Sequence, residues 1–98
     1  MIKIKPGVKV KGIQPEMLLA TQIVASVYSM YNNADCVIVT VRAQNTPLHQ
    51  TGYAVDFDLS NLASGWHEKV CRDVQRALGD RYDVKIYQRH LHVEYDPT

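Results

Sequence analysis

Tyr82-Asp-Val-Lys-Ile-Tyr87 and Leu91-His-Val-Glu-Tyr95 are two β-prone runs near the C-terminus, with three residues between them. Short runs of this kind so close together predict a pair of strands joined by a tight turn. His90 and His92 lie in or beside the second run. Because side chains alternate along a strand, a spacing of two residues puts both imidazoles on the same face.

Three segments upstream also favour extended structure. Residues 36–41 form a continuous β-prone run that predicts a central strand, and residues 53–59 alternate between two faces. At the N-terminus, Ile-Lys-Ile-Lys and Val-Lys-Val-Lys flank Pro6-Gly7, which predicts short extended segments with a turn between them. The lysines of this stretch favour a solvated edge strand over a nucleic-acid contact.

Two segments show the apolar period of amphipathic helices. The first begins at Pro15 and ends at Asn32-Asn33, and the second spans about residues 64–78 and is capped by Gly79. The apolar stripe of the first helix contains Met17, Leu19, Ala20, Ile23, Val24, Val27 and Tyr31. The stripe of the second helix contains Trp66, Val70, Val74, Ala77 and Leu78.

Length and composition fit one domain that spans residues 1–98. A chain of 98 residues has room for one core, and 46% hydrophobic with 21% charged residues is ordinary globular composition. This excludes a disordered chain, a collagen-like chain and a coiled coil. Strands interleaved with two helices, followed by a terminal hairpin, predict an α+β domain with its helices on one face of a mainly antiparallel sheet.

Charge and hydropathy argue against several partners. A net charge of +1 with neutral histidines gives no strong electrostatic footprint for nucleic acid. The longest apolar stretch, residues 17–27, is interrupted by polar residues and is too short for membrane insertion. The N-terminus has no signal-peptide pattern, so we expect a cytoplasmic location, with Cys36 and Cys71 as buried free thiols.

The histidine pair and two further residues have the composition of a metal site. His49 ends a polar loop and Asp56 lies on the next strand, so an imidazole and a carboxylate can converge there. Two imidazoles and one carboxylate are the ligands of a catalytic zinc, which keeps its fourth position for water. A non-haem iron site uses the same ligand types, but its first two ligands are usually closer together in sequence. We expect His67, on the second helix, to be solvated.

A longer pattern surrounds these residues. His49-Gln-Thr-Gly52-Tyr-Ala54-Val-Asp56-Phe57 matches H-x-x-G-x-A-x-D-[FLI]. Together with the C-terminal His-x-His strand, it resembles the zinc D-alanyl-D-alanine carboxypeptidase family, which includes peptidoglycan peptidases, phage endolysins and small phage-encoded relatives. Residues 12–20 and 90–97 also resemble the small phage relatives, so the resemblance covers nearly the whole chain. It implies the fold group that includes lysostaphin-type peptidases and the amino-terminal Hedgehog signalling domain.

The resemblance implies roles for individual residues. His49 and Asp56 are the first two zinc ligands, and the third comes from the His90/His92 pair, where we favour His92. His90 then stands beside the metal as a proton carrier or a hydrogen-bond donor. Arg42 is either the arginine that binds a substrate carbonyl or carboxylate, or an ordinary surface residue.

The sequence departs from the family pattern in two places. The loop before His49 looks short, and it has Pro47 where related sequences carry a serine two residues before the first histidine. The small phage relatives carry a glutamate as general base three residues before the first histidine of the pair, and this chain has Tyr87 there. Tyrosine, with a reference pKa of about 10, is a poor base at neutral pH. Glu94, on the face of the histidine pair, or Asp58, on the face of Asp56, could replace that base or orient an imidazole.

The sequence therefore predicts a zinc-dependent peptidase that hydrolyses a peptide bond in peptidoglycan stem peptides. It would act as a carboxypeptidase or as an endolysin, and it would be phage or prophage encoded. The alternative is a catalytically impaired homologue that keeps the fold, with or without the zinc, and acts as a binding or virion-associated protein.

Overall fold

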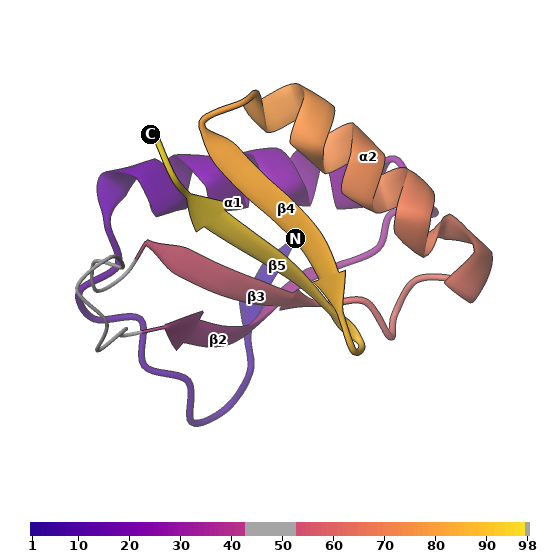
Figure 1. Cartoon of the computed structure of the whole chain (residues 1–98). Coiled ribbons are helices and arrows are strands. Elements are labelled where there is room, and N and C mark those ends of the chain that lie inside the picture. The colour runs from indigo at the N-terminus through magenta and orange to yellow at the C-terminus, as the bar shows by residue number, and fades with distance from the viewer. Residues whose placement is uncertain (43–52, 98) are drawn as a thin grey trace.

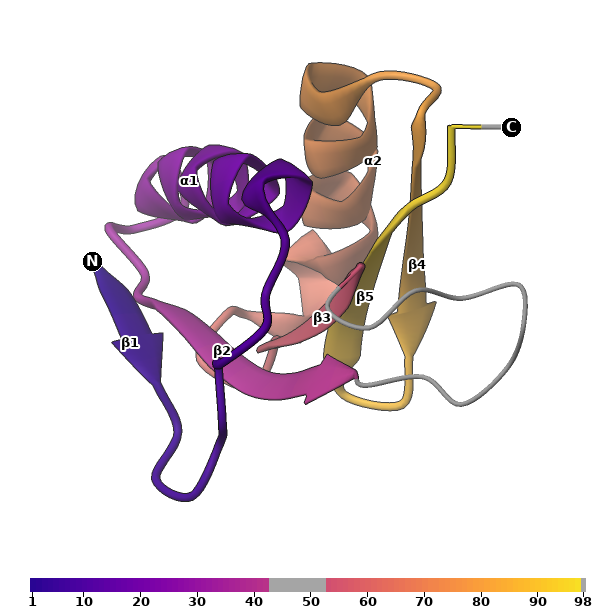
Figure 2. The same ribbon diagram turned by 90° about the vertical axis from the view of Figure 1, so that its left-hand side faces the viewer.

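Five strands form one sheet and two helices cover one of its faces in the computed structural model, which describes residues 1–42 and 53–97 (Figure 1). The strands are β1 (Ile2–Ile4), β2 (Cys36–Arg42), β3 (Ala54–Asp58), β4 (Tyr82–Tyr87) and β5 (His90–Tyr95). The helices are α1 (Pro15–Ser29) and α2 (His67–Leu78), the latter preceded by a 3₁₀ turn at Ser64–Trp66. The predicted α+β architecture is confirmed, and Figure 2 shows both helices on the same side of the sheet.

The strand order places β5 inside the sheet. The order is β1-β2-β3-β5-β4, with β1 parallel to β2 and every other neighbouring pair antiparallel. The predicted C-terminal hairpin is present, and its two-residue turn has Gln88 at a φ of 55°. Because β5 rather than β4 pairs with β3, Asp56 lies directly opposite His92.

Helix α1 provides much of the core, although its buried face differs in part from the predicted stripe. Pro15 occupies the first turn as predicted, and Met17, Ala20, Val24 and Val27 are buried. Leu19, however, is 59% exposed, which corrects its predicted place in the stripe. An α-helix turns about 100° per residue, so Leu19 projects to the side opposite Met17. The buried face instead includes Thr21 and Tyr28.

The two polar side chains on the buried face of α1 are both hydrogen-bonded. The Thr21 hydroxyl donates to the Met17 carbonyl oxygen at 2.7 Å, and the Tyr28 hydroxyl donates to the Asp58 carbonyl oxygen at 2.8 Å. Buried polar groups must be hydrogen-bonded to avoid a large desolvation cost. The Tyr28 bond therefore ties α1 to the end of β3.

Helix α2 lies toward the β4 edge of the sheet and buries a narrower face than predicted. Val70 and Val74 are fully buried, whereas Ala77 is exposed and Trp66 is 39% exposed. Trp66 packs against Tyr31 with a ring-centroid distance of 5.5 Å. Gly79 ends the helix as predicted, with a φ of 89° that favours glycine. None of the described helices is long and apolar enough to cross a membrane.

The N-terminal segment contains one strand rather than two extended segments. Residues 2–4 form β1, and the Lys5 amide continues the pairing by donating to the Ile38 carbonyl. The chain then turns at Pro6-Gly7, as predicted, and residues 8–10 form no strand. Val8 is instead partly buried against the core. The second half of the N-terminal alternation therefore adds no strand to the sheet.

The two cysteines occupy different environments. Cys36 is fully buried, and burial raises the pKa of its thiol to about 12. Cys71 is only half-buried, which corrects the prediction that both thiols are buried. Both are free thiols.

Side chains of α2 cover half of the outer edge of β4. Gln75 Nε2 donates to the carbonyl oxygens of Tyr82 (2.7 Å) and Gly79 (2.9 Å), and Gln75 Oε1 accepts from the Val84 amide (3.0 Å). The Cys71 thiol donates to the Val84 carbonyl oxygen at 3.7 Å. Unpaired edge groups invite intermolecular pairing, so these contacts protect the edge and hold β4 against α2.

We expect Gln75→Ala to destabilise the domain by about 1–2 kcal/mol, because several backbone groups of β4 and its turn lose their partner. In a domain of this length, that loss lowers the melting temperature by roughly 5–10 °C. Gln22→Ala is the matched control, since Gln22 is exposed on α1. Denaturant melts of both variants measure the effect, and equal stability of the two would contradict the assigned role of Gln75.

Candidate functional site

The face of the sheet that the helices leave open contains three of the predicted site residues, Asp56, His90 and His92. Val55 and Phe57 of β3 face the helices and are fully buried in the core. Asp56 alternates to the opposite face, where it pairs with His92 of β5 and Thr40 of β2. Because side chains alternate along a strand, neighbouring residues of β3 belong to the core on one face and to the candidate site on the other.

Asp56 and His92 are in direct contact. Nδ1 of His92 lies 2.7 Å from Oδ1 of Asp56. Asp56 is only 4% exposed although it points away from the core. A carboxylate this deeply buried must be paired or bind a cation, because its desolvation is otherwise very costly. The contact places His92, which we favour as the third zinc ligand, next to Asp56.

A second carboxylate reaches the other ring nitrogen of His92. Nε2 lies 3.2 Å from Oε1 of Glu94, which is two residues further along β5. The pKa of His92 is raised above its ordinary value of 6.5, chiefly because Asp56 accepts a hydrogen bond from the ring. Partial burial acts in the opposite direction, and Glu94 adds a smaller increase. A protonated ring donates from both nitrogens, one to each carboxylate.

His90 and Asp58 lie further along the same face. They are directly opposite each other on β5 and β3, and His90 also pairs with Tyr87 of β4. The Asp58 carboxylate accepts from the Ser60 amide at 2.9 Å and from the Ser60 hydroxyl at 2.7 Å. These bonds form a local turn at the end of β3. Asp58 therefore serves the turn, and Glu94 is the better placed of the two carboxylates considered as a substitute base.

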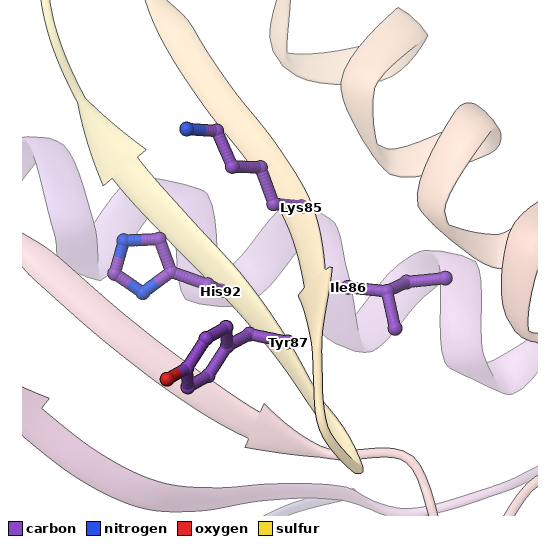
Figure 3. Close-up of a pocket in the computed structure, with 4 residues that line it drawn as sticks. All are labelled: Lys85, Ile86, Tyr87 and His92. Atoms are coloured by element: carbon purple, nitrogen blue, oxygen red, sulfur yellow. The ribbon is translucent and has the colours of Figure 1, made fainter.

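A hollow of about 340 Å³ adjoins His92 and is lined by Lys85, Ile86, Tyr87 and His92 (Figure 3). Figure 3 shows Lys85, His92 and Tyr87 pointing to the same side of the hairpin, with His92 between the other two and Ile86 directed away. Tyr87 is 59% exposed. Lys85 lies directly opposite His92. Lys85 was not among the predicted site residues, although its two-residue spacing from Tyr87 in the sequence places both on one face of β4.

The remaining predicted residues are His49, Arg42 and His67. His49 and the side chain of Arg42 lie outside the described part of the structure. His67 is half-buried rather than solvated, because its Nε2 lies 3.1 Å from the Leu62 carbonyl oxygen. That contact holds the loop before α2, on the helix side of the sheet, and gives His67 a structural role.

The donor set at Asp56 and His92 fits zinc. An imidazole nitrogen and a carboxylate oxygen are ordinary zinc ligands. Metal-binding histidines usually give their second ring nitrogen to a carboxylate, and Glu94 is in that position. Within residues 1–42 and 53–97, no group of three or more His, Cys, Asp or Glu side chains is arranged to hold a metal ion. A complete site therefore needs a further ligand, and His49 is the predicted one.

No family model, curated protein or solved structure matches the chain significantly. The sequence pattern and the geometry of Asp56, His92 and their neighbours are therefore the basis for assigning a function.

Titration of His92 tests this geometry in protein freed of metal by a chelator. We expect a pKa above 6.5 by NMR, and Asp56→Asn should lower it more than Glu94→Gln does, because the Asp56 bond is the larger cause. A raised folded-state pKa contributes stability that is fully present below the unfolded-state pKa. The free energy of unfolding should therefore fall as pH rises from about 6.5 through the folded-state pKa. A His92 pKa that is unchanged by Asp56→Asn would contradict the contact.

Proposed function

We propose that the chain is a zinc-dependent peptidase of the D-alanyl-D-alanine carboxypeptidase type, with the fold of the Hedgehog and D,D-peptidase group. It hydrolyses a peptide bond in peptidoglycan stem peptides. The observation that carries the proposal is the 2.7 Å contact between Asp56 and His92. These residues come from two separate motifs, 36 positions apart, and both motifs are the ones that the family resemblance assigns to the metal.

His49, Asp56 and His92 would hold the zinc. Bound zinc acts as a Lewis acid on a carbonyl and lowers the pKa of a water ligand to about 7. His92 must be neutral to bind a metal, so metal binding displaces a proton from the imidazole. Glu94 then retains its contact with the second ring nitrogen and keeps the ring oriented.

In the proposed enzyme, the residues next to the metal site would transfer protons during hydrolysis. Tyr87 lines the hollow beside His92, but its phenol is a poor base near neutral pH. Glu94 is the carboxylate that we assign to proton transfer, and His90 is assigned as a hydrogen-bond donor to the substrate. Because Glu94 also contacts His92, it is less available as a base than an unattached glutamate at position 87 would be. We therefore expect slow catalysis.

The exposure of Tyr87 favours a second function, that of a binding protein. An exposed tyrosine is typical of protein interfaces, and Tyr87 is exposed on the outermost strand next to the site. A homologue that has lost its base could keep the fold and the zinc and bind a partner through this face. Turnover of peptide substrates distinguishes this binding protein from the enzyme.

Zinc dependence of hydrolysis is the direct test of the enzyme. Zinc-loaded protein should release D-alanine slowly from a stem peptide that ends in D-alanyl-D-alanine, or cut cross-linked muropeptides, as measured by mass spectrometry. Chelation and Asp56→Ala should each abolish the reaction, whereas Asp80→Ala, in the exposed turn before β4, should not. Hydrolysis that survives both chelation and Asp56→Ala would exclude the proposed centre.

Tyr87→Glu tests whether the absence of a glutamate at position 87 limits the rate of hydrolysis. A positioned general base contributes about 10²–10⁴-fold to rate, so Tyr87→Glu should raise kcat by at least the lower of these factors. Tyr87→Gln, with the same length and no charge, is the matched control and should not raise it. Fast wild-type hydrolysis that Glu94→Gln abolishes would show that Glu94 has fully taken over the role. Zinc binding without turnover in wild type and Tyr87→Glu would favour the binding protein.

A further inference from the structure

Lys85 is a cation beside the candidate zinc centre that the family resemblance does not use. It lies directly across from His92 in the β4–β5 pairing, so the Cβ atoms of the two residues are about 5 Å apart. Its side chain is exposed and lines the same hollow as Tyr87 and His92 (Figure 3). Lys85 makes no ion pair with any carboxylate in the described residues.

We propose that the hollow between Lys85, Tyr87 and His92 binds the terminal carboxylate of a peptide, and that Lys85 is the residue that selects it. This inference rests on the proposed function, and it names the residue of this chain that would select substrates with a free C-terminus over cross-linked ones. In a peptide, the free carboxylate lies one residue beyond the last peptide bond, and one residue spans about 3.8 Å between Cα atoms. Lys85 and His92 are cross-strand neighbours, so the long lysine side chain can reach a carboxylate one residue beyond a peptide bond held beside His92.

The chemistry of the hollow suits a carboxylate. The Lys85 ammonium provides up to three hydrogen-bond donors, and the Tyr87 hydroxyl provides another. Lys85 comes from the half of β4 beyond Val84, where Gln75 and Cys71 of α2 no longer cover the strand edge. The hollow is therefore open to an extended peptide that approaches from the outer edge of the sheet.

Lys85 has a simpler alternative role that the experiment must separate. Asp56, Asp83 and Glu94 lie on the same face by strand alternation, so Lys85 could merely offset their negative charge. In that role, Lys85 would affect stability or metal affinity without distinguishing peptides by their C-termini. Only the proposed role predicts that substitution of Lys85 alters the preference for a peptide acid over the corresponding peptide amide.

The experiment measures equilibrium binding of two peptides to the zinc-loaded protein by NMR titration. The peptides are diacetyl-L-lysyl-D-alanyl-D-alanine, whose only carboxylate is terminal, and its C-terminal amide. The acid should bind about tenfold more tightly than the amide to the wild type, as expected for one charge-assisted hydrogen bond. Lys85→Met should remove this preference, and Lys85→Arg should retain part of it. Arg89→Gln removes a cation from the same hairpin outside the hollow and should leave the preference unchanged.

The other outcomes either overturn the inference or separate it from the proposed function. Equal binding of acid and amide to the wild type, no binding of either, or a preference that survives Lys85→Met excludes the carboxylate site. Equally tight binding of an amidated peptide that carries an internal D-glutamyl carboxylate would exclude recognition of the terminus. If the acid preference depends on Lys85 but the protein neither takes up zinc nor cuts the peptide, the proposed function fails while the carboxylate site remains.

Discussion

The antiparallel register of β5 on β3 is the constraint on which the candidate site depends. It places Asp56 opposite His92 and Ala54 opposite Glu94. Side chains alternate with a period of two, so a shift of one residue would send His92 toward the helices and Val93 toward the open face. Val55 and Val93 are both fully buried and pair across these strands. Burial of these valines therefore maintains the register that brings the carboxylate and the imidazole together.

The same alternation explains how a polar site can lie against a small core. The side of β3 that faces the helices carries Val55 and Phe57, and the other side carries Asp56. A buried carboxylate is costly, and His92 offsets that cost through a short hydrogen bond. A zinc ion at this position would take over the same task with a greater charge. The sheet thus holds an acidic group out of water beside an imidazole that hydrogen-bonds to it.

The sequence predicted those features that depend on local periodicity. The hairpin at residues 82–95, the strand at residues 36–41, the start of α1 at Pro15 and the cap at Gly79 all follow from side-chain pattern or backbone preference. The common face of His92 and Glu94 also follows from a period of two.

Other features depend on pairing between distant segments, which a single sequence does not display. Nothing local predicts that β5, rather than β4, pairs with β3, or that β2 shifts register between Ile38 and Thr40 and so places Thr40 opposite Asp56. Lys85 became part of the site only through its position across from His92. Leu19 is exposed although it is apolar, because it lies two residues from Met17 and so projects away from the buried face of α1.

Anomalous diffraction at the zinc edge, from crystals grown with zinc, tests the central claim most directly. The account predicts one peak at about 2.0–2.2 Å from an Asp56 carboxylate oxygen and at about 2.0–2.1 Å from a ring nitrogen of His92, with His49 as a further ligand. Data without a peak between these residues, in which His92 still donates directly to Asp56, would contradict the account. A peak held by other side chains alone would contradict it equally.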